Sequence, residues 1–250
     1  MNNSESALQF FSKVDGTKLG YRVRAGARPG PTLLFLPGYA SDMEGAKAMA
    51  LDQFAEHRGF AMVRFDYSGT GSSEGRFEDG TLELWLDETL AVIDELTQGQ
   101  LILVGSSMGG WLALHAALRR PERVQALVGI AAAPDFTDWG FTDEQKDAIQ
   151  RLGRIGGDED GPSVVTLGLW KSGEKLHLLD TQIAIDCPVR LIHGELDANV
   201  PIEIADRLMR QLRSADVQLT VLKAGGHRLS EPNEIEAILR TVNALMEPTL

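Results

Sequence analysis

Two segments of the sequence, residues 71–75 and 105–109, have the pattern Gly-x-Ser-x-Gly, which can present a serine hydroxyl as a nucleophile. With 26 glycines in 250 residues, chance alone produces such a match often enough that its context has to decide. A nucleophile turn needs a buried strand before it and a helix directly after it. The apolar run 101–104 and the helix-forming run 110–120 flank the second segment, whereas a Gly/Ser-rich loop surrounds the first. We therefore predict Ser107 as the nucleophile and Ser73 as a loop residue.

A serine hydroxyl needs a histidine to accept its proton and a carboxylate to orient that histidine. His227 lies in a glycine-containing loop after the last predicted strand, and Asp197 follows the strand predicted before it. Both loops lie where the carboxyl ends of parallel strands face a crevice. Asp135 remains an alternative acid, and Glu195 is a weaker one. We expect packing or surface roles for the remaining histidines: His57, His115, His177 and His193.

A tetrahedral intermediate in acyl transfer carries an oxyanion, which needs two preorganised hydrogen-bond donors. One predicted donor is the backbone N–H of Met108, directly after the nucleophile and at the start of a helix. The other is predicted in the loop 37–41, and we choose the backbone N–H of Tyr39. These reactions require no metal and no organic cofactor, and we predict neither.

Short apolar runs alternate with segments of helical periodicity, which predicts an α/β fold with a mostly parallel sheet flanked by helices. Residues 19–24 alternate in polarity like an edge strand, and the other strands read as buried. The buried strands are expected at 32–36, 61–65, 101–104, 124–130, 189–192 and 217–222, and the helices at 45–57, 82–97, 111–120, 202–213 and 235–246.

The connection between the predicted strands 124–130 and 189–192 is longer than one helix and two loops require. We predict a small cap or lid over residues 135–185, inserted into a hydrolase core formed by residues 1–134 and 186–250. Within the predicted cap, residues 142–145 have the spacing of a helix capping box. Aromatic residues among acidic ones indicate an apolar underside: Phe136, Trp139, Phe141 and Trp170.

The formal net charge of −12, from 24 basic and 36 acidic residues, makes nucleic acid an improbable partner. It also disfavours anionic substrates unless a basic patch offsets it, for which Arg76, Arg228 and Lys171 are candidates. The one cysteine, Cys187, excludes an internal disulfide and a cysteine-rich metal site. No targeting segment and no run of 18 apolar residues is visible, so we predict a cytoplasmic protein without a membrane span.

The stretches 37–48, 65–75 and 104–117 resemble the α/β-hydrolase superfamily, and within it a group of mitochondrial acyl-protein thioesterases and acyl-glucuronide esterases. The order Ser107, Asp197, His227 along the chain is the order of that superfamily. The resemblance implies an enzyme that hydrolyses carboxylic esters or thioesters of fatty or aryl acids. Its substrates would be small-molecule or lipidic acyl esters, and acylated proteins are a further class. Other triad hydrolases remain alternatives, namely a C–C bond hydrolase, a lactonase or a small peptidase, as does a non-catalytic ligand-binding protein.

Overall fold

The computed structural model describes residues 6–156 and 164–247, and over these residues eight strands form one sheet in the order β1-β2-β4-β3-β5-β6-β9-β10. Strand β2 is antiparallel to both of its neighbours, and the other adjacent pairs are parallel. This confirms the predicted fold class. The strands are β1 (Gln9–Ser12), β2 (Lys18–Arg24), β3 (Thr32–Leu36), β4 (Met62–Phe65), β5 (Leu101–Ser106), β6 (Val124–Ile130), β9 (Val189–Gly194) and β10 (Val217–Leu222).

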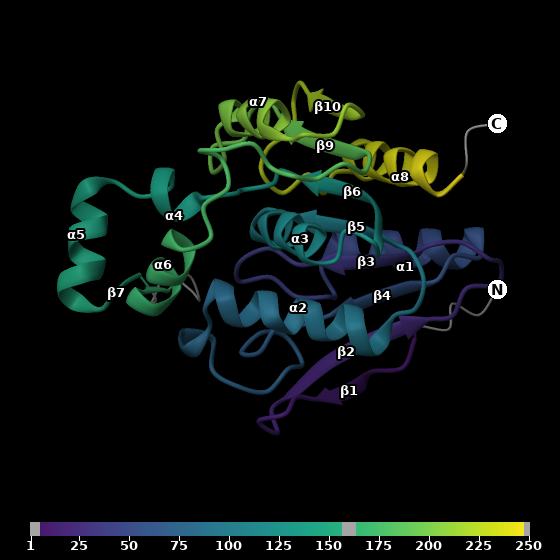
Figure 1. The fold of residues 1–250 in the computed structure, drawn as a ribbon, viewed down its shortest axis with the longest axis horizontal. Helices are drawn as coiled ribbons and strands as arrows, with labels where there is room; N and C mark the ends of the chain where they lie inside the picture. Colours follow the sequence, from purple (N-terminus) through teal and green to yellow (C-terminus); the bar gives the residue numbers. More distant parts are fainter. Residues whose placement is uncertain (1–5, 157–163, 248–250) are drawn as a thin grey trace.

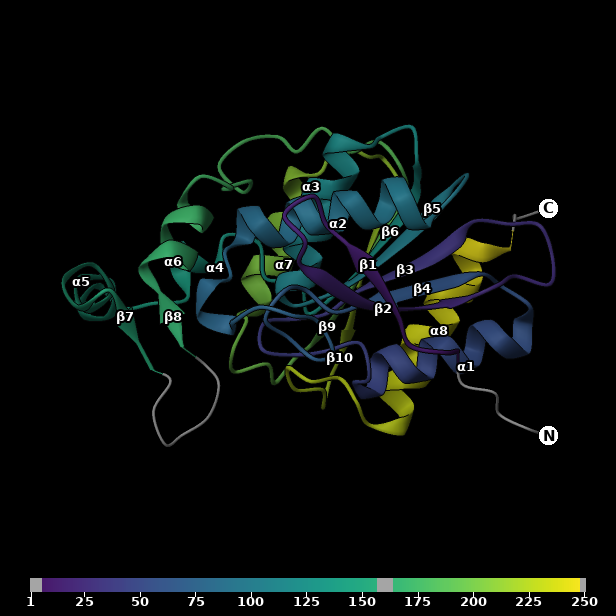
Figure 2. The same cartoon turned by 90° about the horizontal axis from the view of Figure 1, so that it is seen from below.

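Helices cover both faces of the sheet (Figures 1 and 2). Helices α1 (Ala46–Arg58) and α8 (Pro232–Met246) lie on one face, and α2 (Leu82–Leu96), α3 (Met108–Arg119) and α7 (Ile202–Gln211) lie on the other. Successive side chains of a strand point to opposite faces. In β3, Leu33 packs with the first layer and Leu34 with the second. Because both faces are covered, the central strands β3 and β5 consist mostly of buried apolar residues.

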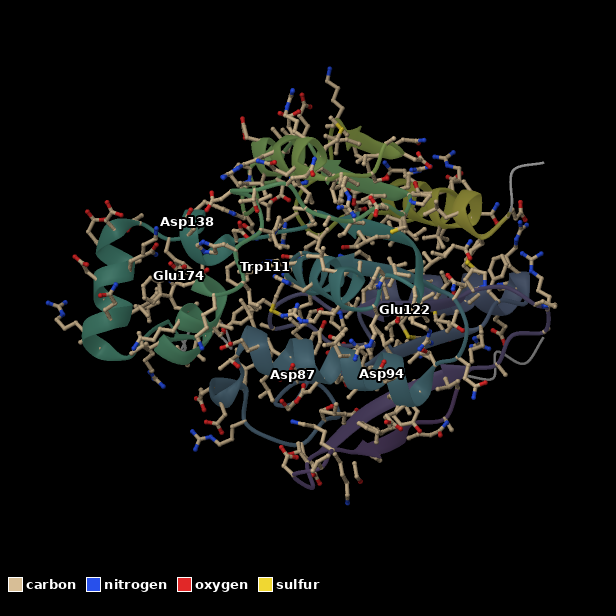
Figure 3. The ribbon with its side chains drawn as sticks, in the orientation of Figure 1. Asp87, Asp94, Trp111, Glu122, Asp138 and Glu174 are labelled. Atoms are coloured by element: carbon tan, nitrogen blue, oxygen red, sulfur yellow. The ribbon has the colours of Figure 1, made fainter. Side chains whose placement is uncertain are left out.

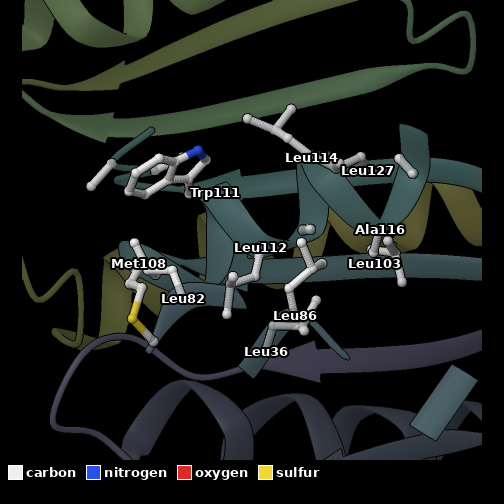
Figure 4. Close-up of a cluster of buried hydrophobic side chains, with 14 of the residues drawn as sticks. Leu36, Leu82, Leu86, Leu103, Met108, Trp111, Leu112, Leu114, Ala116 and Leu127 are labelled. Carbon is white, nitrogen blue, oxygen red and sulfur yellow. The ribbon is translucent and has the colours of Figure 1, made fainter. Parts of the chain in front are cut away.

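Helix α3 is the central element of the larger core (Figure 4). Its side chains Trp111, Leu112 and Leu114 are fully buried. In Figure 4 the side chains of this helix lie among those of the sheet, such as Leu36 and Leu103, and of the neighbouring helix α2, such as Leu86. A helix that is apolar around most of its circumference has one stable position in such a core. The residue that precedes α3 is therefore held in a fixed place above the sheet.

Two predictions about strands are wrong. Strand β2, predicted at the edge of the sheet, lies between β1 and β4, because the unpredicted strand β1 pairs with it. Strand β10, predicted to be buried, is the edge strand next to β9, and its residues are half-buried or exposed. Its sequence is mostly apolar, but an edge strand has a neighbour on one side only. Helices α3 and α8 also begin three residues earlier than predicted, at Met108 and Pro232.

The residues between β6 and β9 form a separate group of short elements at one end of the sheet (Figure 1). The capping box is confirmed, since Thr142 and Gln145 exchange side-chain-to-backbone hydrogen bonds. The predicted cap boundaries, 135–185, include residues 157–163, which lie outside the described residues, and a lid movement stays a prediction. The elements are α4 (Phe136–Trp139), α5 (Asp143–Leu152), β7 (Arg154–Ile155), β8 (Val165–Thr166) and α6 (Leu167–Glu174), and the core adds a 3₁₀ turn at Phe77–Asp79.

Candidate active site

Ser107 lies in the sharp turn between β5 and α3, with φ 53° and ψ −118°. Residues other than glycine rarely adopt this backbone conformation, which costs about 1–3 kcal/mol. Two hydrogen bonds hold the turn in place. The Ser107 N–H donates to the Ile130 carbonyl (2.9 Å), and the Ser107 carbonyl accepts from the Ala133 N–H (3.1 Å). The neighbouring strand β6 and its loop thus stabilise the strained residue.

The glycines on either side of Ser107 are required by close backbone approaches. A Cβ atom on Gly105 would lie 2.3 Å from the Gly109 carbonyl oxygen. A Cβ atom on Gly109 would lie 2.1 Å from the Leu36 carbonyl oxygen at the end of β3. No flexible side chain is available to move aside at either point. The Gly-x-Ser-x-Gly pattern therefore has the steric reason that the sequence suggested.

Ser107, His227 and Asp197 lie together in one hydrogen-bonded chain. Ser107 Oγ is 3.1 Å from His227 Nε2, and His227 Nδ1 is 2.8 Å from Asp197 Oδ2. The Asp197 side chain is 0% exposed, and its second oxygen accepts from the backbone N–H groups of Asn199 and Val200, both at 2.9 Å. A carboxylate cannot donate, so His227 Nδ1 carries a proton and Nε2 is left to accept from the serine hydroxyl.

The two predicted oxyanion donors border the same space. Within the described residues, neither the Tyr39 N–H nor the Met108 N–H donates a hydrogen bond. The loop of Tyr39 passes directly beside the serine, since a Cβ atom on Gly38 would lie 3.4 Å from Ser107 Cβ. Both amides are therefore available to a ligand at Ser107, and their role as oxyanion donors stays a prediction.

The side chain of Tyr39 fixes this loop in place. Its ring packs against Phe77, with 5.1 Å between the centroids, and against Trp85, at 6.0 Å. Its hydroxyl donates to the carbonyl of Val164, and this hydrogen bond joins the core to the segment between β6 and β9, here called the inserted segment. Burial raises the pKa of Tyr39 well above the ordinary tyrosine value, so the hydroxyl remains a donor.

The alternative nucleophile and acids have structural contacts elsewhere. Ser73 Oγ donates to the Asp66 carbonyl (2.6 Å) and accepts from the Gly20 N–H (2.8 Å), which joins a loop to β2. The Asp135 carboxylate accepts from the N–H groups of residues 178 and 179, at 2.8–3.0 Å. It thereby joins the two ends of the inserted segment. Glu195 is exposed.

The other histidines also have local partners. His193 Nε2 is 2.9 Å from the Val200 carbonyl and 3.5 Å from Asp197 Oδ2, so it packs behind the acid. His115 Nε2 is 2.8 Å from the Leu176 carbonyl, and burial lowers the pKa of His115 to about 4. His57 contacts the Gln53 carbonyl on its own helix, and His177 lies 3.3 Å from Glu174.

Two cavities meet at Ser107 and His227. The first, of about 640 Å³, lies between the core and the inserted segment, and aromatic and aliphatic residues dominate its lining. The second, of about 420 Å³, lies between the loop after β3, the start of α1 and the loop after β10. It includes Lys47, which the sequence analysis did not single out. Its position in the first turn of the helix after the Tyr39 loop was the available signal. The first cavity is lined by Met108, Ala133, Phe136, Trp139, Phe141, Ile155, Val165 and Val200, among others.

Residues 31–150 match the family described as alpha/beta hydrolase fold. The chain is 39% identical to the human mitochondrial palmitoyl-protein thioesterase ABHD10 over 254 residues, which are 97% of this chain and 81% of the relative. The structure of alpha/beta hydrolase domain-containing protein 10 from mouse superposes with a TM-score of 0.89 at 36% identity, covering 96% of this chain and 98% of that one. The crystal structure of a putative hydrolase from Agrobacterium vitis S4 also superposes with a TM-score of 0.89 at 36% identity, covering 97% of this chain and 99% of that one.

These comparisons confirm the resemblance seen in the sequence and contradict the predicted cytoplasmic location. The human relative, which matches nearly the whole chain, is a mitochondrial protein. The prediction had depended on seeing no targeting segment, and a missing signal is weaker than a match of this extent. Over the described residues, no helix has the length and apolar character that crossing a bilayer demands.

Proposed function

Since the chain belongs to the α/β-hydrolase family of enzymes, we propose that it cleaves carboxylic esters or thioesters through an acyl-enzyme formed on Ser107. One observation carries this proposal. Ser107 Oγ, the His227 ring and the Asp197 carboxylate form a continuous hydrogen-bonded path that ends at a largely apolar cavity. This arrangement supplies the nucleophile, the general base and the orienting acid that acyl transfer requires.

In the proposed acylation step, Ser107 Oγ attacks the substrate carbonyl carbon while His227 Nε2 accepts the hydroxyl proton. The buried Asp197 carboxylate stabilises the imidazolium that forms. The N–H groups of Tyr39 and Met108 stabilise the oxyanion, an effect worth about 2.7–4 kcal/mol for one donor. As the tetrahedral intermediate collapses, the same His227 proton passes to the departing alcohol or thiol.

Deacylation repeats these steps with water as the nucleophile. His227 Nε2 accepts a proton from the water that attacks the acyl carbonyl, and then returns it to Ser107 Oγ as the carboxylic acid leaves. The 23% exposure of the His227 side chain agrees with this role, since the ring has to be reached by water as well as by substrate.

The lining of the first cavity supports an acyl group that is apolar. Phe136, Phe141 and Val165 line it, and its volume lies within the range of small-molecule sites. A long-chain acyl thioester of a protein is the substrate class that the name of the human relative indicates, and we propose that this chain acts on the same class. Small lipidic esters with the same acyl group fit the same cavity.

Labelling with a fluorophosphonate probe tests the nucleophile. We expect the wild type and Ser73→Ala to be labelled and Ser107→Ala to be unlabelled, with folding checked by thermal unfolding. Labelling of Ser107→Ala would show that the nucleophile lies elsewhere.

Paired esters and thioesters of acetyl to palmitoyl chains then test the acyl class. We expect kcat/KM to be larger for octanoyl and longer chains than for acetyl, because the cavity is lined by large apolar side chains. A preference for acetyl would contradict the apolar assignment of the cavity.

A further inference from the structure

An ester or thioester carbonyl has two substituents, and two cavities diverge from Ser107. They share the residues next to the carbonyl position, among them Tyr39, Ser107 and His227. The first cavity is lined mostly by apolar residues and lies between the core and the inserted segment. The second is bordered by polar and charged residues of the core. If the acyl group fills the first cavity, the substituent that leaves extends into the second.

Proton transfer from His227 is compatible with this assignment. His227 has to protonate the departing oxygen or sulfur atom, so the leaving group lies on the side of its ring. The residue that follows, Arg228, lines the second cavity and not the first. His227 lines both cavities, so it can protonate a leaving group in the second one, which Arg228 also borders.

Two cations line this second cavity without an ionic partner. Among the residues that the structure describes, neither the Lys47 ammonium nor the Arg228 guanidinium forms an ion pair with a carboxylate. The Lys47 ammonium donates to the backbone carbonyl of Arg228, which holds the two residues together. Burial lowers the pKa of Lys47, because removing the ammonium from water disfavours its charged form. An anion in the cavity would offset that effect.

Two carboxylates around this cavity, Asp42 and Glu234, accept hydrogen bonds from the backbone. Asp42, which lines the cavity, accepts from the Glu44 N–H (2.9 Å). Glu234, whose charge acts on Lys47, accepts from the Glu231 N–H (2.8 Å) at the start of α8. The charged groups that line the cavity are thus two cations and one carboxylate.

This local positive charge contrasts with the rest of the molecule. The net charge is −12, and acidic side chains such as Asp87, Asp94 and Glu174 lie on the outer faces of α2 and the inserted segment (Figure 3). Arg76, another cation considered from the sequence, forms an ion pair with Glu78 at 2.9 Å. Lys47 and Arg228 thus differ from Arg76, because they border the cavity beside Ser107 and form no ion pair within the described residues.

We propose that the second cavity binds the leaving group, and that Lys47 and Arg228 bind a carboxylate or phosphate carried on that leaving group. This rests on the proposed hydrolase function. When the bond between Ser107 Oγ and the acyl carbon forms, the bond from that carbon to the departing sulfur or oxygen breaks. The proton from Ser107 moves through His227 to the departing atom. The anionic group takes no part in these steps and leaves with the released thiol or alcohol.

The test compares four octanoyl thioesters that differ only in the thiol. The thiols are 3-mercaptopropionate, 2-mercaptoethyl phosphate, the neutral 2-mercaptoethanol and the cationic thiocholine, whose quaternary ammonium cannot accept the acyl group. The measured quantity is kcat/KM for each anionic thioester divided by kcat/KM for the neutral one. A charge-assisted hydrogen bond discriminates by ~10-fold or more, so we expect a ratio of ~10 for at least one anion. The comparison between carboxylate and phosphate identifies which anion the cavity takes.

The variants Lys47→Met and Arg228→Met are each expected to lower this ratio, and the double variant to bring it to ~1. Dividing by the neutral substrate within each variant cancels general losses of activity. Lys18→Met removes the same charge from an exposed site on β2 and should leave the ratio unchanged. Because Arg228 is exposed, Arg228→Met alone serves if Lys47→Met fails to fold.

The outcomes separate this proposal from the one it rests on. Hydrolysis of all four thioesters at similar rates, or an anion preference that persists in Arg228→Met and the double variant, would refute the anion site while leaving the hydrolase assignment intact. If none of the thioesters is cleaved and the fluorophosphonate probe does not label Ser107, the proposed function and the anion site fail together.

Discussion

Replacing Asp197 by asparagine tests the role of the acid, because the structure dictates how the new amide must orient. One carboxylate oxygen accepts from two backbone N–H groups, at Asn199 and Val200. An NH₂ group cannot take that place, because it would face two donors. The amide oxygen of Asp197→Asn therefore keeps those contacts, and its NH₂ group turns toward His227.

That orientation reverses the hydrogen bond to the histidine. The amide NH₂ donates to His227 Nδ1, so the ring proton moves to Nε2. Nε2 then cannot accept the proton of Ser107 Oγ, from which it is 3.1 Å away. Holding the histidine of a serine triad in the wrong tautomer lowers kcat by about 10⁴-fold, which corresponds to about 5 kcal/mol of transition-state stabilisation. We expect a loss of this size for Asp197→Asn.

The assay is hydrolysis of p-nitrophenyl octanoate, followed as kcat and kcat/KM, with thermal unfolding of each variant. Asp135→Asn is the matched control, because Asp135 is also buried and also accepts backbone hydrogen bonds, from residues 178 and 179. We expect Asp135→Asn to lower stability by about 1–3 kcal/mol and to keep most of its activity when folded. Near-normal turnover of Asp197→Asn, or a larger loss in folded Asp135→Asn, would refute the assignment.

Three further predictions concern the turn, the core and the cavity. Gly109→Ala places a Cβ atom 2.1 Å from the Leu36 carbonyl, so denaturant titration should show a loss of at least about 1–3 kcal/mol; an unchanged midpoint would contradict the close approach. Burial keeps His115 neutral, with a pKa of about 4 against 6.5 when unfolded. Because the unfolded chain binds a proton at His115 first, the free energy of unfolding falls by about 3 kcal/mol as the pH is lowered from above 6.5 to 4. The unfolding free energy of His115→Gln should therefore depend less steeply on pH over that range. Val165→Trp, in the cavity lining, should lower kcat/KM for palmitoyl esters far more than for acetyl esters, whereas Val221→Trp on the exposed edge strand should not.

The parts of the fold that were predicted correctly are those that local sequence determines. Residues 101–104 are an apolar run of strand length, and the helix former after them continues without a loop, so the turn at Ser107 could be placed from the sequence. The proximity of Asp197 and His227 followed from both residues lying after parallel strands, because such strands end at the same edge of the sheet.

The inserted segment could not be derived in the same way, because distant contacts hold it. Trp111 Nε1 donates to the Leu176 carbonyl (3.0 Å), and Tyr39 reaches Val164 across 125 residues of sequence. Elements as short as α4, β7 and β8 have too few residues for periodicity to detect them. The place of Lys47 in the site could not be predicted for a similar reason, since its partner, the carbonyl of Arg228, lies 181 residues away in the sequence.

The geometry separates what must stay constant in this enzyme from what can vary. Ser107 is held by backbone contacts to β3 and β6, so its position depends on glycines and on strand packing and not on side chains that a substrate touches. The first cavity takes much of its lining from the inserted segment, whereas the residues that line the second cavity all belong to the core. On the proposed assignment of the two cavities, acyl selectivity and leaving-group selectivity reside in different parts of the chain. Ser107 and His227, which both cavities share, are held by the sheet edge and by Asp197. Substitutions in one cavity should therefore change the substrate preference of that cavity without affecting the preference of the other.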